Sequence, residues 1–266
     1  LSVDDSSVQE LPGVRKVINL GDAVAVIADG YWQAHKALGK LSVEFSDGGN
    51  SAAEQEGIFS QFADELDSAA AEGREKSDFI AGNAAAALDG AANVIEAEYR
   101  YPFLAHAAME PMTCVIRLDE QGCEVWNGEQ LHTGDQMALA GFLGITPQQV
   151  RVNTLFAGGS FGRRANPQSD YLLEAAAIAK AGGGKAPVKL VWTREDDMRA
   201  GWYRPLYLHR LRAGLGDDGL PVAWEHRIVG QSIVAESEDG FEHADIGISQ
   251  AHLGPAAAEA IGQVTV

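Results

Sequence analysis

The sequence has little cysteine, no standard metal-ligand spacing and no long apolar run. Cys114 and Cys123 are the only cysteines among its 266 residues, and neither a CxxC nor an HExxH motif occurs. The histidines are too scattered to complete a zinc template. No apolar run approaches the ~18 residues that a membrane-spanning helix needs. These absences disfavour a structural metal site and a helical membrane protein.

The two cysteines flank an expected hairpin turn over residues 119–122. If Leu118 pairs with Cys123, Cys114 lies opposite Asn127, and the rise of a strand separates the two thiols by roughly 13 Å. A disulfide requires Cα atoms within about 7 Å of each other. We therefore expect no disulfide in this register.

Basic residues are few compared with acidic ones. The chain has 20 Lys and Arg against 38 Asp and Glu, a formal net charge of −18. Such a surface repels nucleic-acid phosphate and anionic lipid, which excludes a general DNA-binding protein. Residues 151–212 are the exception, with 11 basic and 5 acidic residues. That stretch is suited to bind a small anion.

Length and patterning predict a globular α+β chain with more than one part. Hydrophobic residues make up 46% of the chain and charged residues 22%, as in soluble domains. The length suits one large domain or two modest ones. The chain begins with Leu1 rather than Met, and we expect it to be a piece of a longer polypeptide.

Residues 1–50 are predicted to form a small α/β unit, followed by a helical linker over residues 51–92. In the linker, Ser51 and Glu54 form a capping-box pattern, and Ile58, Phe62 and Leu66 share one helical face. A short Ala-rich helix is expected near residues 83–88. In the first unit we expect strands at 14–18, 23–28 and 41–45 and a helix at 31–38.

Residues 93–266 are predicted to form a second, mixed α/β domain. Ile95 to Tyr101 alternates apolar and polar residues, which predicts a half-buried strand. Residues 236–266 have no sustained period and receive no assignment. Between Tyr101 and residue 236 we expect a hairpin at 113–126, helices at 133–143 and 167–181, strands at 150–156 and 188–192, and a hairpin at 207–229.

The sharpest local motif is the run Gly158-Gly-Ser-Phe-Gly-Arg-Arg164, between an expected strand and an expected helix. Its glycines permit positive φ, so that backbone N–H groups can converge on an anion. Asn166 is a candidate cap and Pro167 a candidate first residue of the next helix, whose positive end would lie beside the loop. Two arginines would complete the site. A Gly-rich turn with solvated arginines is the alternative.

The same run satisfies the G-x-S-x-G pattern of a nucleophile elbow, with Ser160 as nucleophile. In an elbow the helix follows the serine directly, whereas here four residues and Pro167 intervene. A serine hydrolase using Ser160 is kept as one alternative function. A noncatalytic acidic binding module is kept as another.

Three further segments carry candidate residues, each with a plain structural alternative. His106 and Glu110 lie between prolines, which indicates a loop rather than a metal-binding helix. Gln130 follows a strand, where its amide can donate to an oxo ligand without a change of charge, or simply be a turn residue. Tyr203 belongs to an Arg- and Tyr-rich segment that would equally suit a salt-bridged surface.

Taken together and in order, five sequence blocks resemble the molybdenum-binding large subunit of the xanthine dehydrogenase and aldehyde oxidase family. The resemblance covers about residues 10–235 and is closest to the isoquinoline 1-oxidoreductase β-subunit branch. It implies part of that family's hammerhead domain first, then part of its molybdopterin-binding domain. The blocks span residues 105–112, 124–130, 158–163, 192–198 and 229–232.

The resemblance implies a cofactor and its ligands. The cofactor would be molybdopterin, as the cytosine dinucleotide, carrying molybdenum. Gln130 matches the glutamine that hydrogen-bonds the apical oxo group, His106 and Glu110 belong to the active-site shell, and no residue here binds the metal directly. The loop residues matching the cofactor-binding segment are Gly158, Gly159, Ser160, Phe161, Gly162 and Arg163.

The resemblance also implies the reaction and the partner. Members of the family hydroxylate a carbon with oxygen from water, using a glutamate base from a C-terminal region that this chain lacks. The piece alone is therefore expected to be inactive. Two cysteines cannot hold an iron–sulfur cluster, so the 2Fe–2S clusters would lie on a small partner subunit.

Two departures from the family pattern bear on the substrate. Purine-hydroxylating members carry a glutamate and an arginine at the places occupied here by Ala165 and Tyr203. An N-heteroaromatic compound or an aldehyde is therefore expected in place of xanthine. The resemblance implies a bacterial protein, with the periplasm as the expected compartment and the cytoplasm as the alternative.

Overall fold

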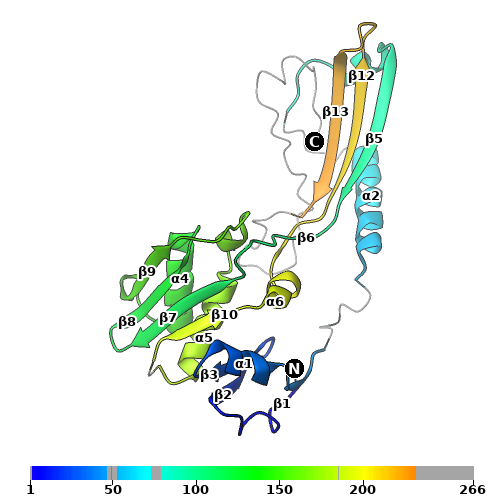
Figure 1. Cartoon of the computed structure of the whole chain (residues 1–266). Coiled ribbons are helices and arrows are strands. Elements are labelled where there is room, and N and C mark those ends of the chain that lie inside the picture. The colour runs from blue at the N-terminus through cyan, green and yellow to red at the C-terminus, as the bar shows by residue number, and fades with distance from the viewer. Residues whose placement is uncertain (1, 47–48, 50–52, 73–78, 185, 232–266) are drawn as a thin grey trace. The chain divides into compact units, whose positions relative to one another are not determined.

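The computed structural model describes residues 2–46, 49, 53–72, 79–184 and 186–231 (Figure 1). Ser51 of the expected capping box and the unassigned residues 236–266 lie outside these ranges. The chain divides into two units, each built from two separate stretches of sequence. Unit 1 comprises Leu1–Ser51 and Ala105–Trp202, and unit 2 comprises Ala52–Leu104 and Tyr203–Val266.

The main element of unit 1 is a four-stranded sheet in the order β10-β7-β8-β9. β7 (Thr113–Asp119) and β8 (Gly122–Gly128) form the expected hairpin, and β10 (Val188–Val191) pairs antiparallel with β7. β9 (Val150–Leu155) runs parallel to β8, which requires the crossover that α4 (His132–Leu143) supplies. The sheet is therefore mixed.

Helices α4 and α5 (Asp170–Ala181) pack against this sheet and close the core of unit 1. Ile116 and Val125 of the sheet and Leu139 and Leu172 of the helices are fully buried. The hairpin register is the expected one, with Cys114 opposite Asn127 and Leu118 opposite Cys123. Both cysteines are buried as free thiols.

Smaller elements complete unit 1. At its start, β2 (Val14–Asn19) pairs with β3 (Val24–Ala28), and β1 (Ser2–Asp4) pairs with β4 (Ser42–Glu44). Helix α1 (Tyr31–Leu38) has the predicted bounds. Later in the unit lie the 3-10 turns Pro147–Gln149 and Arg163–Ala165 and the short helix α6 (Arg194–Arg199).

Unit 2 is a three-stranded antiparallel sheet in the order β13-β12-β5. Its strands are β5 (Asn93–Tyr101), β12 (Tyr207–Leu215) and β13 (Pro221–Gly230). Phe59, Phe62 and Leu66 of α2 (Gln55–Glu72) pack on Leu208 and Val229 of the sheet. Helix α3 (Ala84–Asp89) begins after Asn83, whose side chain accepts the N–H of Ala86. The two-residue strands β6 (Leu104–Ala105) and β11 (Tyr203–Arg204) pair with each other.

Three local predictions differ from the structure. The apolar face of β5 is not buried against another layer as expected, since Ile95, Tyr99 and Tyr101 are all exposed. Helix α2 begins at Gln55, later than the expected cap. Helix α5 begins at Asp170 rather than Pro167, because Pro167 and Gln168 complete a turn in which Asn166 Oδ1 accepts the N–H of Gln168.

The overall class agrees with prediction, since the chain is a mixed α/β structure. The division into residues 1–50, 51–92 and 93–266 stays a prediction about domains. Within the described residues, no helix is both long and apolar enough to cross a bilayer.

The core of unit 1 gives a direct stability prediction. Leu139→Ala should lower the free energy of unfolding by ~2–5 kcal/mol, because Leu139 is fully buried and its truncation leaves a cavity. Met137→Ala, two residues earlier on α4, is the matched control, because Met137 is 56% exposed. Urea unfolding followed by circular dichroism measures both. Equal effects of the two substitutions would contradict the assigned core face of α4.

Candidate functional site

The glycine-rich loop between β9 and α5 turns sharply and presents its backbone. Gly159, Phe161 and Gly162 all have positive φ, at 95°, 56° and 98°. The loop is exposed as far as Gly162 and becomes buried at Arg163. In the described structure, no hydrogen bond engages the backbone N–H of Gly159, Ser160 or Gly162. Residues with positive φ in a short loop can turn successive backbone N–H groups toward one side, which suits the binding of an anion.

Arg164 holds the base of this loop. Its side chain is 0% exposed, and Nη2 lies 3.0 Å from Glu110 Oε2. Nε donates to the carbonyl of Gly159 at 3.2 Å, and Nη1 lies 3.4 Å from the carbonyl of Gly128. One guanidinium therefore joins the 105–112 segment, the end of β8 and the loop.

Glu110 and Gly158 form a second connection between the same segments. The N–H of Gly158 donates to Glu110 Oε2 at 2.7 Å, and the N–H of Glu110 donates to the carbonyl of Gly158 at 3.0 Å. A Cβ on Gly158 would lie 2.5 Å from Cβ of Glu110, closer than such atoms can approach. Glycine is thus required at position 158 by close packing.

The expectation that both arginine side chains bind an external anion is wrong. Arg163 is buried and forms a two-bond pair with Asp170 at 2.6 and 3.0 Å, and its guanidinium lies over the Trp192 ring. Arg164 is neutralised by Glu110. Burial of a guanidinium requires such a carboxylate partner. The donors left for a ligand are therefore the backbone N–H groups of the loop.

The helix-cap expectation is corrected as well. The residue before α5 is Ser169, with φ of 51°, and its side chain does not cap the helix. Asp170 opens the helix and pairs with Arg163. The positive end of α5 therefore meets a carboxylate of the chain itself.

Gln130 and Ser160 come together at the edge of the loop. The Ser160 hydroxyl donates to Gln130 Oε1 in a short hydrogen bond, and Ser160 Oγ accepts the N–H of Arg164 at 3.0 Å. Because Oε1 is the acceptor here, Nε2 of Gln130 remains available as a donor. Among the described residues, no acceptor is hydrogen-bonded to that Nε2. An amide donor and several backbone donors thus lie together on an exposed loop.

This geometry does not support Ser160 as a nucleophile. Its hydroxyl proton is directed to an amide oxygen, and in the described structure no histidine is bonded to it. A 3-10 turn rather than a helix follows the serine, which differs from a nucleophile elbow. Ser160 is a loop residue that orients Gln130.

The residues assigned to the active-site shell occupy several elements. A ring nitrogen of His106 lies 3.2 Å from the carbonyl oxygen of Trp202, and Ala165 closes the 3-10 turn with an N–H bond to Gly162. Glu110 binds Arg164 rather than pointing freely into a site. Tyr203 begins β11 in unit 2. Their roles toward a substrate stay predictions.

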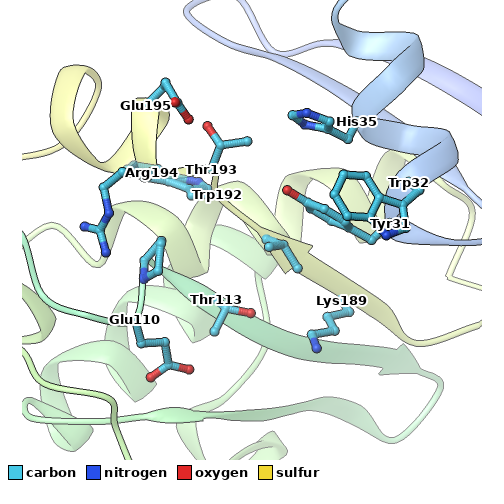
Figure 2. A pocket seen from close by; sticks show the side chains of 12 residues that line it. Tyr31, Trp32, His35, Glu110, Thr113, Lys189, Trp192, Thr193, Arg194 and Glu195 are labelled. Carbon is cyan, nitrogen blue, oxygen red and sulfur yellow. The ribbon is translucent and has the colours of Figure 1, made fainter.

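A separate cavity of about 410 Å³ lies in unit 1, lined by residues of α1, β10 and α6 and by Glu110, Pro111 and Thr113 (Figure 2). Tyr31 and His35 of α1 stack there with ring centroids 5.6 Å apart. The carboxylate of Glu110 points away from these aromatic rings. The cavity shares Glu110 with the loop but none of the loop residues 158–163.

The structure also identifies residues that the sequence motifs did not single out. Glu129 accepts the N–H groups of Gln130 and Leu131, and Asp135 of α4 is buried. The sequence does contain a signal for Asp135, because it lies four residues before buried Leu139, on the core-facing side of the helix. A carboxylate at such a position needs a specific partner.

Comparison with known proteins identifies the family of the chain. The sequence profile of the molybdopterin cofactor-binding domain matches residues 64–240. Isoquinoline 1-oxidoreductase subunit beta of Brevundimonas diminuta is 30% identical over an alignment of 248 residues that covers 88% of this chain and 30% of that protein. The membrane-bound aldehyde dehydrogenase (pyrroloquinoline-quinone) of Gluconacetobacter polyoxogenes is 28% identical over 272 residues, covering 93% of this chain and 33% of that protein.

A solved structure shares the fold. The aldehyde oxidoreductase of Desulfovibrio gigas superposes with a TM-score of 0.59 at 17% identity, over 86% of this chain and 29% of that one. The chain therefore spans about a third of the length of the relatives it matches.

The fold, the loop and these matches define a molybdenum-binding subunit of the xanthine dehydrogenase and aldehyde oxidase class. The profile match covers about two thirds of the chain, which therefore belongs to the family of molybdopterin cofactor-binding domains.

The residues fit such a cofactor on structural grounds. Molybdopterin is anionic, and the loop offers backbone N–H donors at Gly159, Ser160 and Gly162 with the Nε2 donor of Gln130 beside them. Backbone donors bind an anion without adding a buried charge. Gly159, Ser160, Phe161, Gly162 and Gln130 thus form the exposed part of the candidate site. Gly158 and Arg163 support it through their bonds to Glu110 and Asp170.

Removing Arg164 should be costly. Arg164→Met should lower the free energy of unfolding by ~3–5 kcal/mol, because it leaves the Glu110 carboxylate and two carbonyl groups without their buried partner. Adding Glu110→Gln to that variant should recover part of the loss. Denaturant unfolding of the four proteins of this cycle measures both effects.

Arg151→Met is the matched control for Arg164→Met. Arg151 also lies beside a glutamate, but its side chain is 76% exposed and 3.6 Å from Glu124. The control should change the stability by less than ~1 kcal/mol. A loss at Arg164 no larger than at Arg151 would show that the Arg164–Glu110 pair does not hold the loop.

Proposed function

We propose that this chain is part of the large subunit of a molybdenum hydroxylase that oxidises an N-heteroaromatic compound or an aldehyde with oxygen from water. The observation that carries the proposal is a glycine-rich loop whose Gly159, Ser160 and Gly162 N–H groups make no hydrogen bond in the described structure, in contact with Gln130 through Ser160. The family match supports the choice of cofactor.

In this proposal the chain binds and orients the cofactor. Backbone N–H groups of the loop would bind its anionic portion, and Gln130 Nε2 would donate a hydrogen bond to an oxo ligand. The Ser160 hydroxyl fixes the Gln130 amide, so that the donor rather than the acceptor end faces the ligand. The bound molybdopterin, proposed as its cytosine dinucleotide, supplies the two-electron redox chemistry.

The catalytic glutamate is proposed to lie C-terminal to this chain, in the portion that the longer relatives possess. The chain alone should then bind cofactor weakly or not turn over at all. We further propose that residues 1–50 are part of a hammerhead domain, residues 51–92 a helical linker and residues 93–266 part of the molybdopterin-binding domain. A small partner subunit would carry the 2Fe–2S clusters, in a bacterial periplasm.

The substrate class follows from two positions. Ala165 and Tyr203 carry no charge complementary to a purine, whereas the resemblance places a glutamate and an arginine there in purine-hydroxylating members. The names of the relatives include isoquinoline and aldehyde oxidation. A neutral heteroaromatic ring or an aldehyde is therefore the proposed substrate.

Metal content tests the proposal first. The full-length parent protein, purified with whatever co-purifies, should contain about one molybdenum per chain and iron from its partner by mass spectrometry. A preparation from cofactor-competent cells that holds no molybdenum would exclude the hydroxylase. Labelling of Ser160 by a fluorophosphonate would instead support the hydrolase, and absence of both metal and label the binding module.

A single methyl group on the loop should weaken cofactor binding. Gly159→Ala keeps ordinary side-chain clearance of 3.8 Å but forces alanine to φ of 95°, which costs ~1–3 kcal/mol. The molybdenum content of the full-length variant should fall about tenfold at limiting cofactor, because 1.4 kcal/mol is a tenfold change in binding.

The matched control for Gly159→Ala is Gly141→Ala. Gly141 lies inside α4 with open space around it, so alanine there should leave the molybdenum content unchanged and slightly favour the helix. If both variants retain the metal, the loop is not the cofactor site.

Substrate preference is a separate measurement. Initial rates of the intact enzyme should be higher with quinoline-type compounds or aldehydes than with xanthine. A preference for xanthine would overturn the substrate proposal and leave the molybdenum assignment standing.

A further inference from the structure

Asp135 lies in an unusual position for an acidic side chain. It belongs to the first turn of α4 and is only 2% exposed. Its Oδ1 accepts a short hydrogen bond from the Ser169 hydroxyl. Its Oδ2 is buried as well, and among the described residues no donor reaches it. Its side chain interacts by a hydrogen bond with another carboxyl group, that of Glu129.

Glu129 already accepts hydrogen bonds at both of its oxygens. Oε1 accepts the backbone N–H of Gln130 at 3.0 Å and of Leu131 at 3.2 Å. Oε2 accepts Asn127 Nδ2 at 2.8 Å, and the same amide nitrogen lies 2.9 Å from the hydroxyl of Tyr171. A carboxylate with this many donors is stabilised in its ionised form.

Two carboxyl groups in contact cannot both be ionised without a large electrostatic cost. Among the described residues, no salt bridge joins a cation to Asp135 or Glu129, and Arg163 is paired with Asp170. Asp170 adds a further negative charge near Asp135. Tyr171 is uncharged. A proton on Asp135 Oδ2 removes the repulsion and gives the buried oxygen a hydrogen-bond partner in Glu129.

We propose that the Asp135 carboxyl group is protonated at neutral pH and donates a hydrogen bond to the Glu129 carboxylate, and that this hydrogen bond positions Gln130. The chain of contacts runs from Ser169 through Asp135 and Glu129 to the Gln130 backbone, whose side chain meets Ser160. Asp135 is thus a positioning residue. The existence of the proton is independent of the proposed function, and only the consequence for cofactor binding rests on it.

The electrostatic surroundings support this assignment. Burial raises the pKa of Asp135 to about 8, with the hydrogen bond to Glu129 acting in the same direction and that of Ser169 opposing it. Burial also raises the pKa of Glu129, but hydrogen bonds from Asp135, Asn127 and the backbone outweigh it and lower the value. The two groups are therefore driven to opposite ionisation states.

The consequence for pH has a definite sign. A carboxyl group with a pKa raised by folding binds its proton more tightly in the native state, so the native state loses stability as the pH rises toward that pKa. Above it, both carboxyl groups are charged and repel each other. The Glu129 bonds to the Gln130 and Leu131 N–H groups should then weaken together.

Direct observation of the proton is the first test. Carbon NMR of the 266-residue chain, labelled at aspartate carboxyl groups, should show one aspartate that titrates above about pH 7. That resonance should be absent from Asp135→Asn. The Gln130 side-chain amide signals should shift over the same pH range in the wild type and stay constant in Asp135→Asn. If no aspartate titrates outside the ordinary range, the proposal is wrong.

Asp135→Asn is informative because it imitates the protonated state. An asparagine can accept from Ser169 through its oxygen and donate to Glu129 through its nitrogen, at every pH. Its melting temperature should therefore fall less than that of the wild type between about pH 6 and about pH 9. Asp135→Ala removes the hydrogen-bond donor to Glu129. Its melting temperature should therefore be lower than that of Asp135→Asn at every pH.

Glu174→Gln is the matched control. Burial raises the pKa of Glu174 to about 7, yet its Oε2 accepts from Trp192 Nε1 and it has no bond to Gln130. This variant should alter the pH dependence of melting without altering the Gln130 signals or the titrating aspartate. If Glu174→Gln removes the Gln130 shift, the shift does not come from Asp135.

Cofactor binding then separates the two proposals. In the full-length protein, molybdenum retention should fall at alkaline pH in the wild type and remain constant in Asp135→Asn. A titrating Asp135 in a protein that never holds molybdenum would overturn the proposed function alone. Molybdenum retention that is independent of pH in the wild type would overturn the positioning role.

Discussion

The ion pair between Arg164 and Glu110 is the interaction on which the candidate site depends. A fully buried guanidinium is stable only with a carboxylate and further acceptors, and Arg164 has both, in Glu110 and in the carbonyl groups of Gly128 and Gly159. These partners come from three stretches that are far apart in sequence. The loop conformation is thus fixed by hydrogen bonds and an ion pair to other parts of the chain.

In this arrangement charged side chains hold the loop in place, and backbone groups are exposed on it. The charged side chains of Arg163 and Arg164 are consumed in internal pairs, and the exposed part of the loop carries only backbone donors and the Ser160–Gln130 contact. A net-acidic chain can in this way present an anion site without a surface cluster of cations.

The sequence predicted most of the local elements and the location of the loop. Helix α1, the β7–β8 register and the glycine positions follow from short-range patterns, which need no knowledge of the rest of the chain. The roles of Arg164 and Asp135 could not be predicted in this way. Both depend on partners in other segments, Glu110 and Ser169, that only folding brings near.

The failure at β5 has a similar cause. Alternation of Ile95, Tyr99 and Tyr101 with charged residues indicates two different faces, but it does not say that another layer covers the apolar one. The start of α5 was misplaced because Pro167 fits a turn as well as a first helical turn. The family resemblance required five blocks in order, since each block alone has an ordinary structural explanation.

The 2.5 Å approach between Cβ of Glu110 and the place where Gly158 would carry its own Cβ links two positions 48 residues apart. Among homologues, a larger residue at the position of Gly158 should occur only where the position of Glu110 has become small. Loss of that glutamate would in turn leave the buried guanidinium unpaired, so the position of Arg164 should change with both. The residues at these three positions should therefore covary among homologues, because one steric contact and one charge pair link them.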